Sequence, residues 1–238
     1  MSFMLITGCS SYKPLSRGAL VNAKIAVVYD INWTVDTRGL FGGLIALGVV
    51  SGMITDLMKA NFSLITTKMT ESIKENLSTI APEIVIEESA IFYTKKVDES
   101  NDKEKIFRKL LSQGYTHVLT FDINLHYVHK TTGGADFLRL DYVTKISNLR
   151  TQGELFDFKI FPEFLFETKN EDNYSMKDQI LSEKENSPRL FLKTVVAGLK
   201  YLNKKLFQSL KTGKQPVVHD KYNCEKFLRT MGMYSTIN

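Results

Sequence analysis

The most regular alternation of hydrophobic and polar residues runs from Tyr115 to His129. Successive side chains of a β-strand point to opposite faces of its sheet, so this alternation predicts a long strand with one buried face. The apolar face comprises Leu119, Phe121, Ile123, Leu125 and Tyr127. The opposite face comprises Val118, Thr120, Asp122 and Asn124.

Two further strands are predicted directly after this one, with short connections. Gly133–Gly134 suits a two-residue hairpin turn, and residues 137–149 then return with apolar side chains at alternate positions. Gln152–Gly153 predicts a second turn, and residues 155–161 a third strand. The three segments together predict an antiparallel meander.

Apolar residues recur at helical spacing before the meander. In residues 62–80 the spaced positions are Ile65, Met69, Ile73, Leu77 and Ile80. Pro82 cannot continue a helix, so we expect this amphipathic helix to stop ahead of it. Residues 106–111 predict a shorter helix that ends at Gly114.

A longer amphipathic helix is predicted near the C-terminus, over residues 190–210. Its apolar positions are Leu192, Val195, Val196, Leu199, Leu202, Leu206 and Leu210. Ser187 suits the N-cap and Pro188 the first helical position, while Gly213 suits the end of the helix. The outer face of this helix is basic.

Short apolar, β-branched runs at residues 24–31 and 83–89 predict two more strands. The predicted order is therefore strand, helix, strand, helix, three-stranded meander and helix. This order predicts an α/β (α+β) fold, in which a mixed β-sheet with a C-terminal antiparallel meander carries helices packed on the sheet. A chain of 238 residues suits one such domain with appended elements.

The amino terminus changes abruptly from apolar to polar. Residues 3–6 are apolar and end in Ile6–Thr7–Gly8–Cys9, and Ser10 begins a polar run. The order of an aliphatic residue, a small residue, Gly and then Cys resembles the lipobox of bacterial lipoproteins.

The lipobox resemblance implies that the sulfur of Cys9 carries diacylglycerol, that the preceding peptide is removed and that the new amino group is acylated. Ser10, in place of an aspartate, resembles the members that are sorted to the outer membrane. The resemblance therefore implies attachment to the inner leaflet of the outer membrane, with the domain facing the periplasm. Several acyl chains would make such anchoring stable.

The segment before Cys9 is shorter than a working signal peptide. It has eight residues, none of them Lys or Arg, whereas the apolar region of a signal alone needs about 7 to 15. Either the natural start lies upstream of Met1, or the segment is an ordinary buried N-terminal strand.

The chain is thus expected to divide into four parts: a residual or truncated signal peptide (1–8), a lipidated tether (9–22), a single α/β domain (23–212) and a basic tail (213–238). The domain contains an uncharged glycine-rich insert at residues 39–54. Its glycines form two G-x-x-x-G pairs, Gly39 with Gly43 and Gly48 with Gly52. Such pairs let helices approach closely in a membrane, so these four residues are candidate membrane contacts. The favoured alternative is a loop and helix packed on the sheet, with glycine allowing tight contact.

Charge is distributed unevenly along the chain. The net charge is +5, but residues 189–238 carry ten Lys/Arg against two Asp/Glu. A basic segment of this kind can attract anionic lipid head groups or nucleic acid; the alternative is a solvated helix face and tail. No nucleic-acid-binding signature accompanies the charge, so we expect no nucleic-acid partner.

The residues that could support catalysis or metal binding do not form a recognised site. His126 and His129 are three apart on a strand and so point to opposite faces, which excludes a shared metal ion. Asp122 and Asp141 could face each other on paired strands, but no catalytic partner accompanies them. Once Cys9 is acylated, Cys224 is left as a lone, buried thiol. We therefore expect no enzyme activity, no metal and no cofactor.

Four functions are compatible with these patterns. The first is a non-enzymatic envelope lipoprotein, anchored through Cys9, that acts as a structural or accessory component of a periplasmic or outer-membrane assembly with protein partners or other copies of itself. The order of elements from Lys24 to Leu210 is similar to that of the small α/β domains of curli-secretion-type and TolB-amino-terminal-type envelope proteins, which implies the same role. The alternatives are a membrane-inserting oligomer that uses Gly39–Ile54, a soluble α/β interaction domain, or an envelope hydrolase that depends on Asp122.

Overall fold

A computed structural model describes the arrangement of the chain over residues 12–16, 18–38, 43–80, 91–94, 101–130, 136–166 and 186–233. The strands are β1 (Tyr12–Lys13), β2 (Ile25–Arg38), β3 (Ile91–Thr94), β4 (His117–Lys130), β5 (Asp136–Asn148), β6 (Glu154–Ile160), β7 (Glu163–Phe166) and β8 (Lys221–Asn223). The helices are α1 (Gly43–Ile80), α2 (Asn101–Ser112), α4 (Asn186–Thr212) and α5 (Cys224–Thr230).

The described strands form one mixed sheet, which confirms the predicted fold class. The order is β1-β6-β5-β4-β2-β3, and β7 pairs with both β5 and β8. Strands β4, β5 and β6 are the predicted antiparallel meander. Strand β2 lies parallel to both of its neighbours, β4 and β3.

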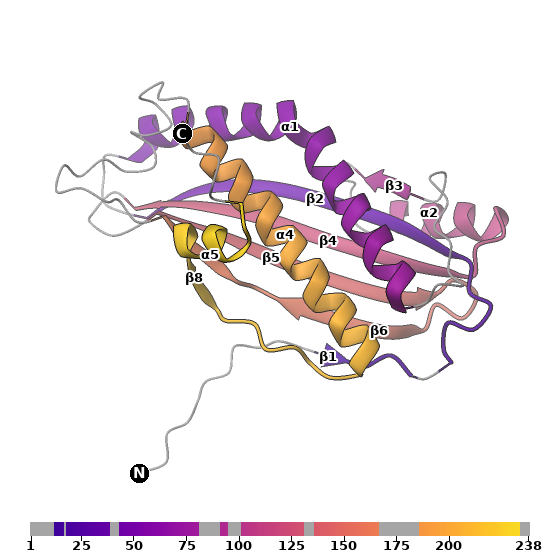
Figure 1. The fold of residues 1–238 in the computed structure, drawn as a ribbon. Coiled ribbons are helices and arrows are strands. Elements are labelled where there is room, and N and C mark those ends of the chain that lie inside the picture. Colours follow the sequence, from indigo (N-terminus) through magenta and orange to yellow (C-terminus); the bar gives the residue numbers. More distant parts are fainter. Residues whose placement is uncertain are drawn as a thin grey trace, which may run out of the picture.

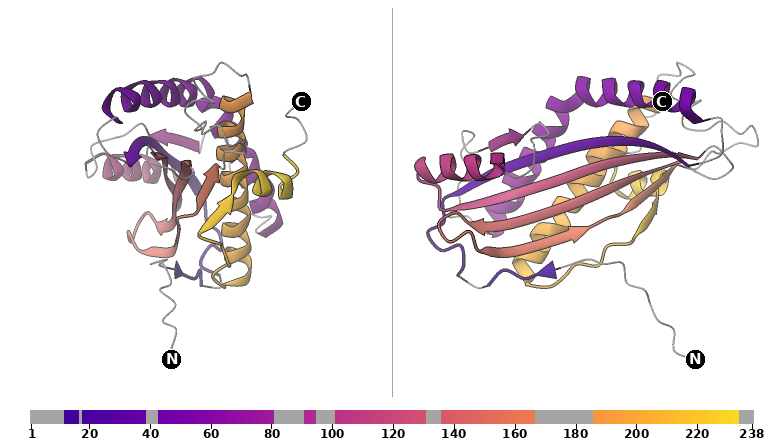
Figure 2. Two further views of the ribbon diagram at one scale, coloured as in Figure 1. Left: turned by 90° about the vertical axis from the view of Figure 1, so that its left-hand side faces the viewer. Right: turned by 180° about the vertical axis from the view of Figure 1, so that it is seen from behind.

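The helices divide unequally between the two faces of the sheet. Helices α1, α4 and α5 cover one face (Figure 1), and the core lies between them and the sheet. Among the described helices, α2 alone lies on the other face, over one end of the long strands (Figure 2, right). There α2 buries Leu110 against a small apolar cluster that comprises Ala26, Val28, Val118 and Leu149.

The faces of the central strands agree with the predicted alternation. In β4 the side chains of Leu119, Phe121, Ile123, Leu125 and Tyr127 are all buried in the core. Thr120, Asp122 and Asn124 are half-buried on the opposite face, which we call the open face of the sheet.

Strand β2 is longer than the sequence indicates. The predicted strand covers residues 24–31, whereas β2 continues to Arg38 because every residue from Ile25 to Arg38 has a partner on β4. Strand β7 was not predicted: Pro162 separates it from β6, and β7 then pairs with β5 at Asp136–Arg139.

Helix α1 joins two segments that the sequence treats separately. It contains 38 residues and begins at Gly43, so most of the glycine-rich insert is the first part of the predicted 62–80 helix. Ile54 is 1% exposed and lies in the core. Gly52 is exposed, and a Cβ atom built there meets nothing within 4 Å, so this glycine does not serve close packing.

Helix α4 packs closely on the sheet at Gly198. A Cβ atom at this position would lie 2.6 Å from Leu140 Cδ1 and 3.3 Å from the Phe164 ring. The helix begins at Asn186, one residue ahead of the predicted Ser187 N-cap, and Gly213 follows its end with φ +65°.

The C-terminal segment is more ordered than the basic tail predicted from residue 213. Strand β8 adds to β7, and helix α5 packs on the core through Phe227 and Leu228. The α5 helix is capped by Asn223, whose side chain accepts a hydrogen bond from the Lys226 N–H at 3.0 Å. Cys224 is buried, as expected, with its Sγ 2.8 Å from Thr194 Oγ1.

The predicted tether, residues 9–22, is also partly docked on the domain. Strand β1 pairs with the edge of β6, with Tyr12 opposite Phe158. The Tyr12 hydroxyl accepts a hydrogen bond from Ser209 Oγ of α4 at 3.0 Å. The domain therefore holds the chain from Tyr12 onward, three residues after Cys9.

Candidate functional site

The open face of the sheet carries a short repeat shared by two neighbouring strands. The sequence Asp-Ile-Asn occurs at 30–32 in β2 and again at 122–124 in β4. The two strands are parallel and in register, so Asp30 lies beside Asp122 and Asn32 beside Asn124. The isoleucines between them point into the core, which places both carboxylates and both amides on the open face.

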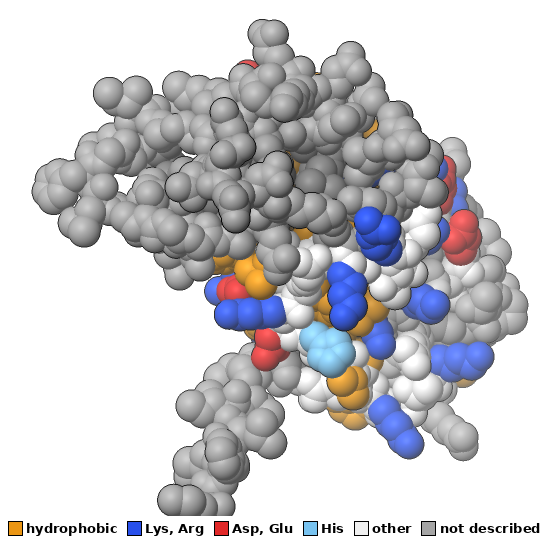
Figure 3. All heavy atoms as spheres, turned by 60° about the vertical axis from the view of Figure 1, so that its left-hand side comes forward, with side chains coloured by type: hydrophobic (Ala, Val, Ile, Leu, Met, Phe, Trp, Pro, Cys, Tyr) orange, Lys and Arg blue, Asp and Glu red, His pale blue; other side chains and the backbone are white. Residues whose placement is uncertain are grey.

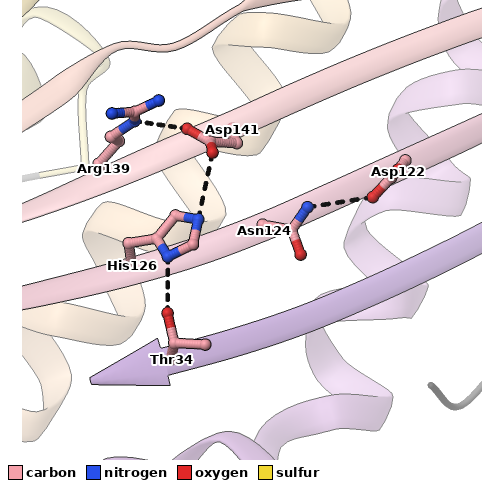
Figure 4. A network of polar contacts seen from close by, with 6 residues as sticks. All are labelled: Thr34, Asp122, Asn124, His126, Arg139 and Asp141. Atoms are coloured by element: carbon pink, nitrogen blue, oxygen red, sulfur yellow. Dashed lines mark hydrogen bonds and ion pairs between the residues drawn. The ribbon is translucent and has the colours of Figure 1, made fainter. Parts of the chain in front are cut away.

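Each aspartate of the repeat is held by the asparagine of its own strand. Asn32 Nδ2 donates to Asp30 Oδ1 at 3.0 Å. Asn124 Nδ2 donates to Asp122 Oδ1 at 3.1 Å, as Figure 4 shows. Like charges side by side destabilise a sheet, and an amide donor on each carboxylate offsets part of that cost.

One step further along the same strands, four side chains form a chain of polar contacts (Figure 4). Thr34 Oγ1 lies 2.6 Å from His126 Nδ1, and His126 Nε2 lies 3.1 Å from Asp141 Oδ2. Arg139 Nε donates to the other oxygen of Asp141 at 2.6 Å. These residues come from β2, β4 and β5, so the contact chain crosses three strands.

The donors and acceptors of this chain follow from the carboxylate. An ionised Asp141 can only accept, so His126 carries its proton on Nε2 and donates it to Asp141. In the neutral ring Nδ1 is then the acceptor, and the Thr34 hydroxyl donates to it. The Thr34 hydroxyl, the His126 ring and the Asp141 carboxylate are therefore hydrogen-bonded one after another. Arg139 donates to the second oxygen of the carboxylate.

The side of the open face near β1 carries charge pairs that neutralise one another. Lys145 Nζ lies 2.5 Å from Glu154 Oε2, and Lys159 Nζ lies 3.0 Å from Asp157 Oδ2. The hydrogen bond to Glu154 raises the pKa of Lys145. Lys13 of β1 donates to the backbone carbonyl of Glu154. The open face is therefore polar and internally paired in this region.

The one cavity that we describe lies on the other side of the sheet, between α1 and α4. It measures about 10 Å³ and is lined by Ile65, Lys68, Met69, Val196, Leu199 and Lys200. This volume accommodates about one water molecule.

The two aspartates considered from sequence do not face each other. Asp122 lies opposite Val143, and Asp141 lies opposite Asn124. Their carboxylates also have separate partners, Asn124 for the first and His126 with Arg139 for the second. A shared carboxylate pair is therefore not formed.

The remaining sequence-based candidates are placed as follows. Cys9, Gly39 and the predicted segments 83–89 and 133–134 lie outside the described residues. Gly43 and Gly48 belong to α1, and Gly52 is exposed on it. Within the described ranges there is no group of three His, Cys, Asp or Glu side chains suited to a metal ion. Over the same ranges, no helix combines the length and apolar character needed to cross a bilayer.

Sequence reasoning missed the paired network on the open face. The signal available was the repeated Asp-Ile-Asn, at Asp30–Asn32 and Asp122–Asn124. This repeat is only three residues long. It predicts neighbouring side chains only if β2 and β4 lie parallel and in register.

The comparisons with known proteins found structural similarities at low sequence identity. No protein-family model and no curated protein matches it. Among solved structures, a PelC dodecamer from Paraburkholderia phytofirmans has 9% identity and a TM-score of 0.28, covering 66% of this chain and 82% of that one. The hypothetical protein CT253 from Chlamydia trachomatis has 10% identity and a TM-score of 0.32, with coverage of 81% and 100%. A putative neuraminyllactose-binding hemagglutinin homolog from Helicobacter pylori has 11% identity and a TM-score of 0.28, with coverage of 79% and 87%. Similarity at this level supports no functional argument.

Proposed function

We propose that this protein is a non-enzymatic envelope lipoprotein that is anchored through Cys9 and binds a protein partner through the open face of its sheet. The partner is an envelope protein or a second copy of the chain, and no cofactor takes part. The lipobox-like Ile6–Thr7–Gly8–Cys9 supports the anchor. The proposal locates the domain in the periplasm, at the inner leaflet of the outer membrane.

The observation that carries the binding role is the arrangement of the described helices, of which only α2 lies on the open face. Along most of the sheet the described helices cover the opposite face (Figure 2), and the open face bears ordered polar side chains that contact one another. Flat polar surfaces with preorganised donors and acceptors suit protein recognition, whereas small molecules are usually bound in clefts of several hundred Å³.

The anchor is tested by the intact mass of the protein expressed in a bacterial host with its natural upstream sequence. We expect a mature chain that begins at Cys9 and carries added acyl mass. A Cys9→Ala variant should lose that mass, and a Cys224→Ala variant should keep it. An unmodified chain that begins at Met1 would contradict the anchor.

The binding face is tested by site-specific photo-crosslinking in the same host. A photoreactive residue at Val143, which lies on the open face, should give a discrete adduct. The same residue at Gln208, which is exposed on α4, should not. An added Asn124→Arg substitution should remove the adduct. Adducts from both positions, or from neither, would contradict the proposal.

A second candidate function is hydrolysis, and one contact favours it. The Thr34 hydroxyl, the His126 ring and the Asp141 carboxylate follow the order of a nucleophile, a base and the group that orients the base. An esterase activity lost in both Thr34→Val and His126→Gln would establish it. Asp122 lies outside this contact chain, so Asp122→Asn should leave such an activity intact.

A further inference from the structure

The outer surface of α4 carries a row of lysines. The basic members of the row are Lys193, Lys200, Lys204 and Lys211, which we call the lysine ridge. Their spacing of seven, four and seven residues keeps them within roughly 40° of one another around the helix, over a length of about 27 Å. Lys200, Lys204 and Lys211 are exposed, and Lys193 is half-buried.

The lysine ridge has no acidic neighbours on its own helix. The 27 residues of α4 include no Asp or Glu. Several other lysines of the fold are paired with carboxylates, such as Lys68 with Glu71 at 2.8 Å and Lys145 with Glu154. In the described part of the chain, Lys200, Lys204 and Lys211 make no ion pair.

The positive surface continues beyond α4. Lys214 follows the helix, and Lys226 and Arg229 are exposed on α5. Figure 3 shows Lys and Arg side chains spread over the described part of this face, with few Asp or Glu among them. The acids of the C-terminal segment are Asp220 and Glu225, and Lys221, next to Asp220, lies 3.8 Å from Glu163. The surface as a whole therefore suits an anionic partner.

The N-terminal segment identifies which anionic partner the ridge fits. Tyr12 is hydrogen-bonded to Ser209, near the C-terminal end of α4. Cys9 precedes Tyr12 by three positions. Three steps of extended chain span at most about 11 Å, which matches the roughly 10 Å diameter of a helix. An acyl chain on Cys9 can therefore reach the plane of the lysine ridge.

We propose that the lysine ridge binds the anionic head groups of a phospholipid membrane, so that α4 lies along the bilayer to which Cys9 is attached. The orientation of the domain rests on the proposed function, because it requires the anchor at Cys9. The affinity of the lysine ridge for head groups does not require the anchor, because it depends on the lysines alone. The open face, on the opposite side of the sheet from α4, is then left facing away from the membrane for a partner.

The test uses the full chain with Cys9→Ala, so that no acyl chain contributes. Cosedimentation is measured at low ionic strength with vesicles of equal parts phosphatidylglycerol and phosphatidylcholine, and with vesicles of phosphatidylcholine alone. We expect binding only to the anionic vesicles. It should be lost near 1 M salt, where the screening length falls to about 3 Å.

The decisive comparison is between two variants that lose the same charge. Replacing Lys200, Lys204 and Lys211 by Gln should weaken vesicle binding on the order of 100-fold. Replacing Lys24, Lys105 and Lys109, which are exposed elsewhere, should change it less than threefold. Circular dichroism checks that both variants are folded. If one of them does not fold, the salt dependence of vesicle binding by the parent chain is the second measurement.

Four results would overturn the inference: no binding of the parent chain to anionic vesicles, equal loss in the two variants, binding unaffected by salt, or retention by duplex DNA without vesicle binding. A failure of the mass measurement at Cys9 together with ridge-dependent vesicle binding would instead remove the anchor and leave the lysine ridge as a membrane-binding surface. The two proposals can therefore fail separately.

Discussion

Among single residues, His117 is held in one neutral tautomer by its neighbours. Asn148 Oδ1 accepts hydrogen bonds from the backbone N–H groups of Arg150 and Thr151, so its Nδ2 is the group that faces His117 Nε2, at 3.4 Å. Nε2 must then accept, and Nδ1 donates to Thr116 Oγ1 at 2.9 Å. A second proton would place two donors face to face.

We therefore predict that acid destabilises the fold through His117. Burial lowers the pKa of this histidine from its usual 6.5. The unfolded chain then binds more protons than the folded chain between the two pKa values, so the free energy of unfolding falls as pH drops from 6.5 toward the folded-state pKa. Urea unfolding at pH 7.5 and pH 5 should show a smaller drop for His117→Gln than for the parent chain. An identical drop would contradict the prediction.

A second residue-scale prediction concerns a hydrogen bond inside the core. Tyr142 donates to Asn203 Oδ1 at 2.5 Å, and both residues are 0% exposed. Burial also raises the pKa of Tyr142 well above 10, so the hydroxyl keeps its proton. Tyr142→Phe leaves the buried amide oxygen without this donor and should lower the free energy of unfolding by about 1 to 3 kcal/mol.

The Tyr142–Asn203 pair supplies its own control. Asn203 Nδ2 is buried and has no hydrogen-bond partner in the described structure. Replacing both residues, as Tyr142→Phe with Asn203→Leu, removes the unsatisfied groups together and should recover part of the loss. Urea unfolding measures all three variants, and a double variant less stable than Tyr142→Phe would argue against the account.

At the scale of whole elements, two glycines in helices distinguish packing from helix propensity. Ala in place of Gly favours a helix by about 1 kcal/mol wherever there is room for the methyl group. Gly52 of α1 has that room, whereas at Gly198 of α4 a Cβ atom would lie 2.6 Å from Leu140 Cδ1. A Gly→Ala substitution therefore brings the same gain in helix propensity at both sites, but only Gly52 has space for the added methyl group.

We predict that Gly52→Ala stabilises the protein by up to about 1 kcal/mol. Gly198→Ala should leave it about 1 to 3 kcal/mol less stable than the Gly52 variant, because the added methyl overpacks the contact between α4 and β5. Thermal and urea unfolding of the two variants measure this difference directly. Equal stabilities would mean that α4 shifts on the sheet without cost.

At the scale of the whole molecule, the two faces of the sheet should respond differently to the same kind of truncation. Leu140 and Val143 belong to β5 and point to opposite faces; Leu140 is fully buried, and Val143 is half-buried on the open face. Leu140→Ala should cost about 2 to 5 kcal/mol of unfolding free energy. Val143→Ala should cost about 1 kcal/mol or less. A comparable loss at Val143 would show that the open face is packed rather than available.

The sequence by itself determined the features that depend on local periodicity. The buried faces of β4 and α4 follow from alternation and from helical spacing, because a side chain's direction is fixed by its neighbours along the chain. The turn at Gln152, whose φ is +54°, and the end of α4 at Gly213 were predicted on the same local grounds. These features led to the correct fold class.

Only the tertiary structure decided which distant segments meet. Strand β2 pairs in register with β4, about 90 residues later, and no local pattern encodes that alignment. It turns two Asp-Ile-Asn segments and Thr34 into one polar network. In the same way, β8 and α5 become part of the fold because Phe227 packs on Tyr201 of α4 and Phe164 of β7, although the surrounding sequence is basic enough to suggest a tail. Long-range pairing depends on the shape and burial of both partners, which a single segment does not reveal.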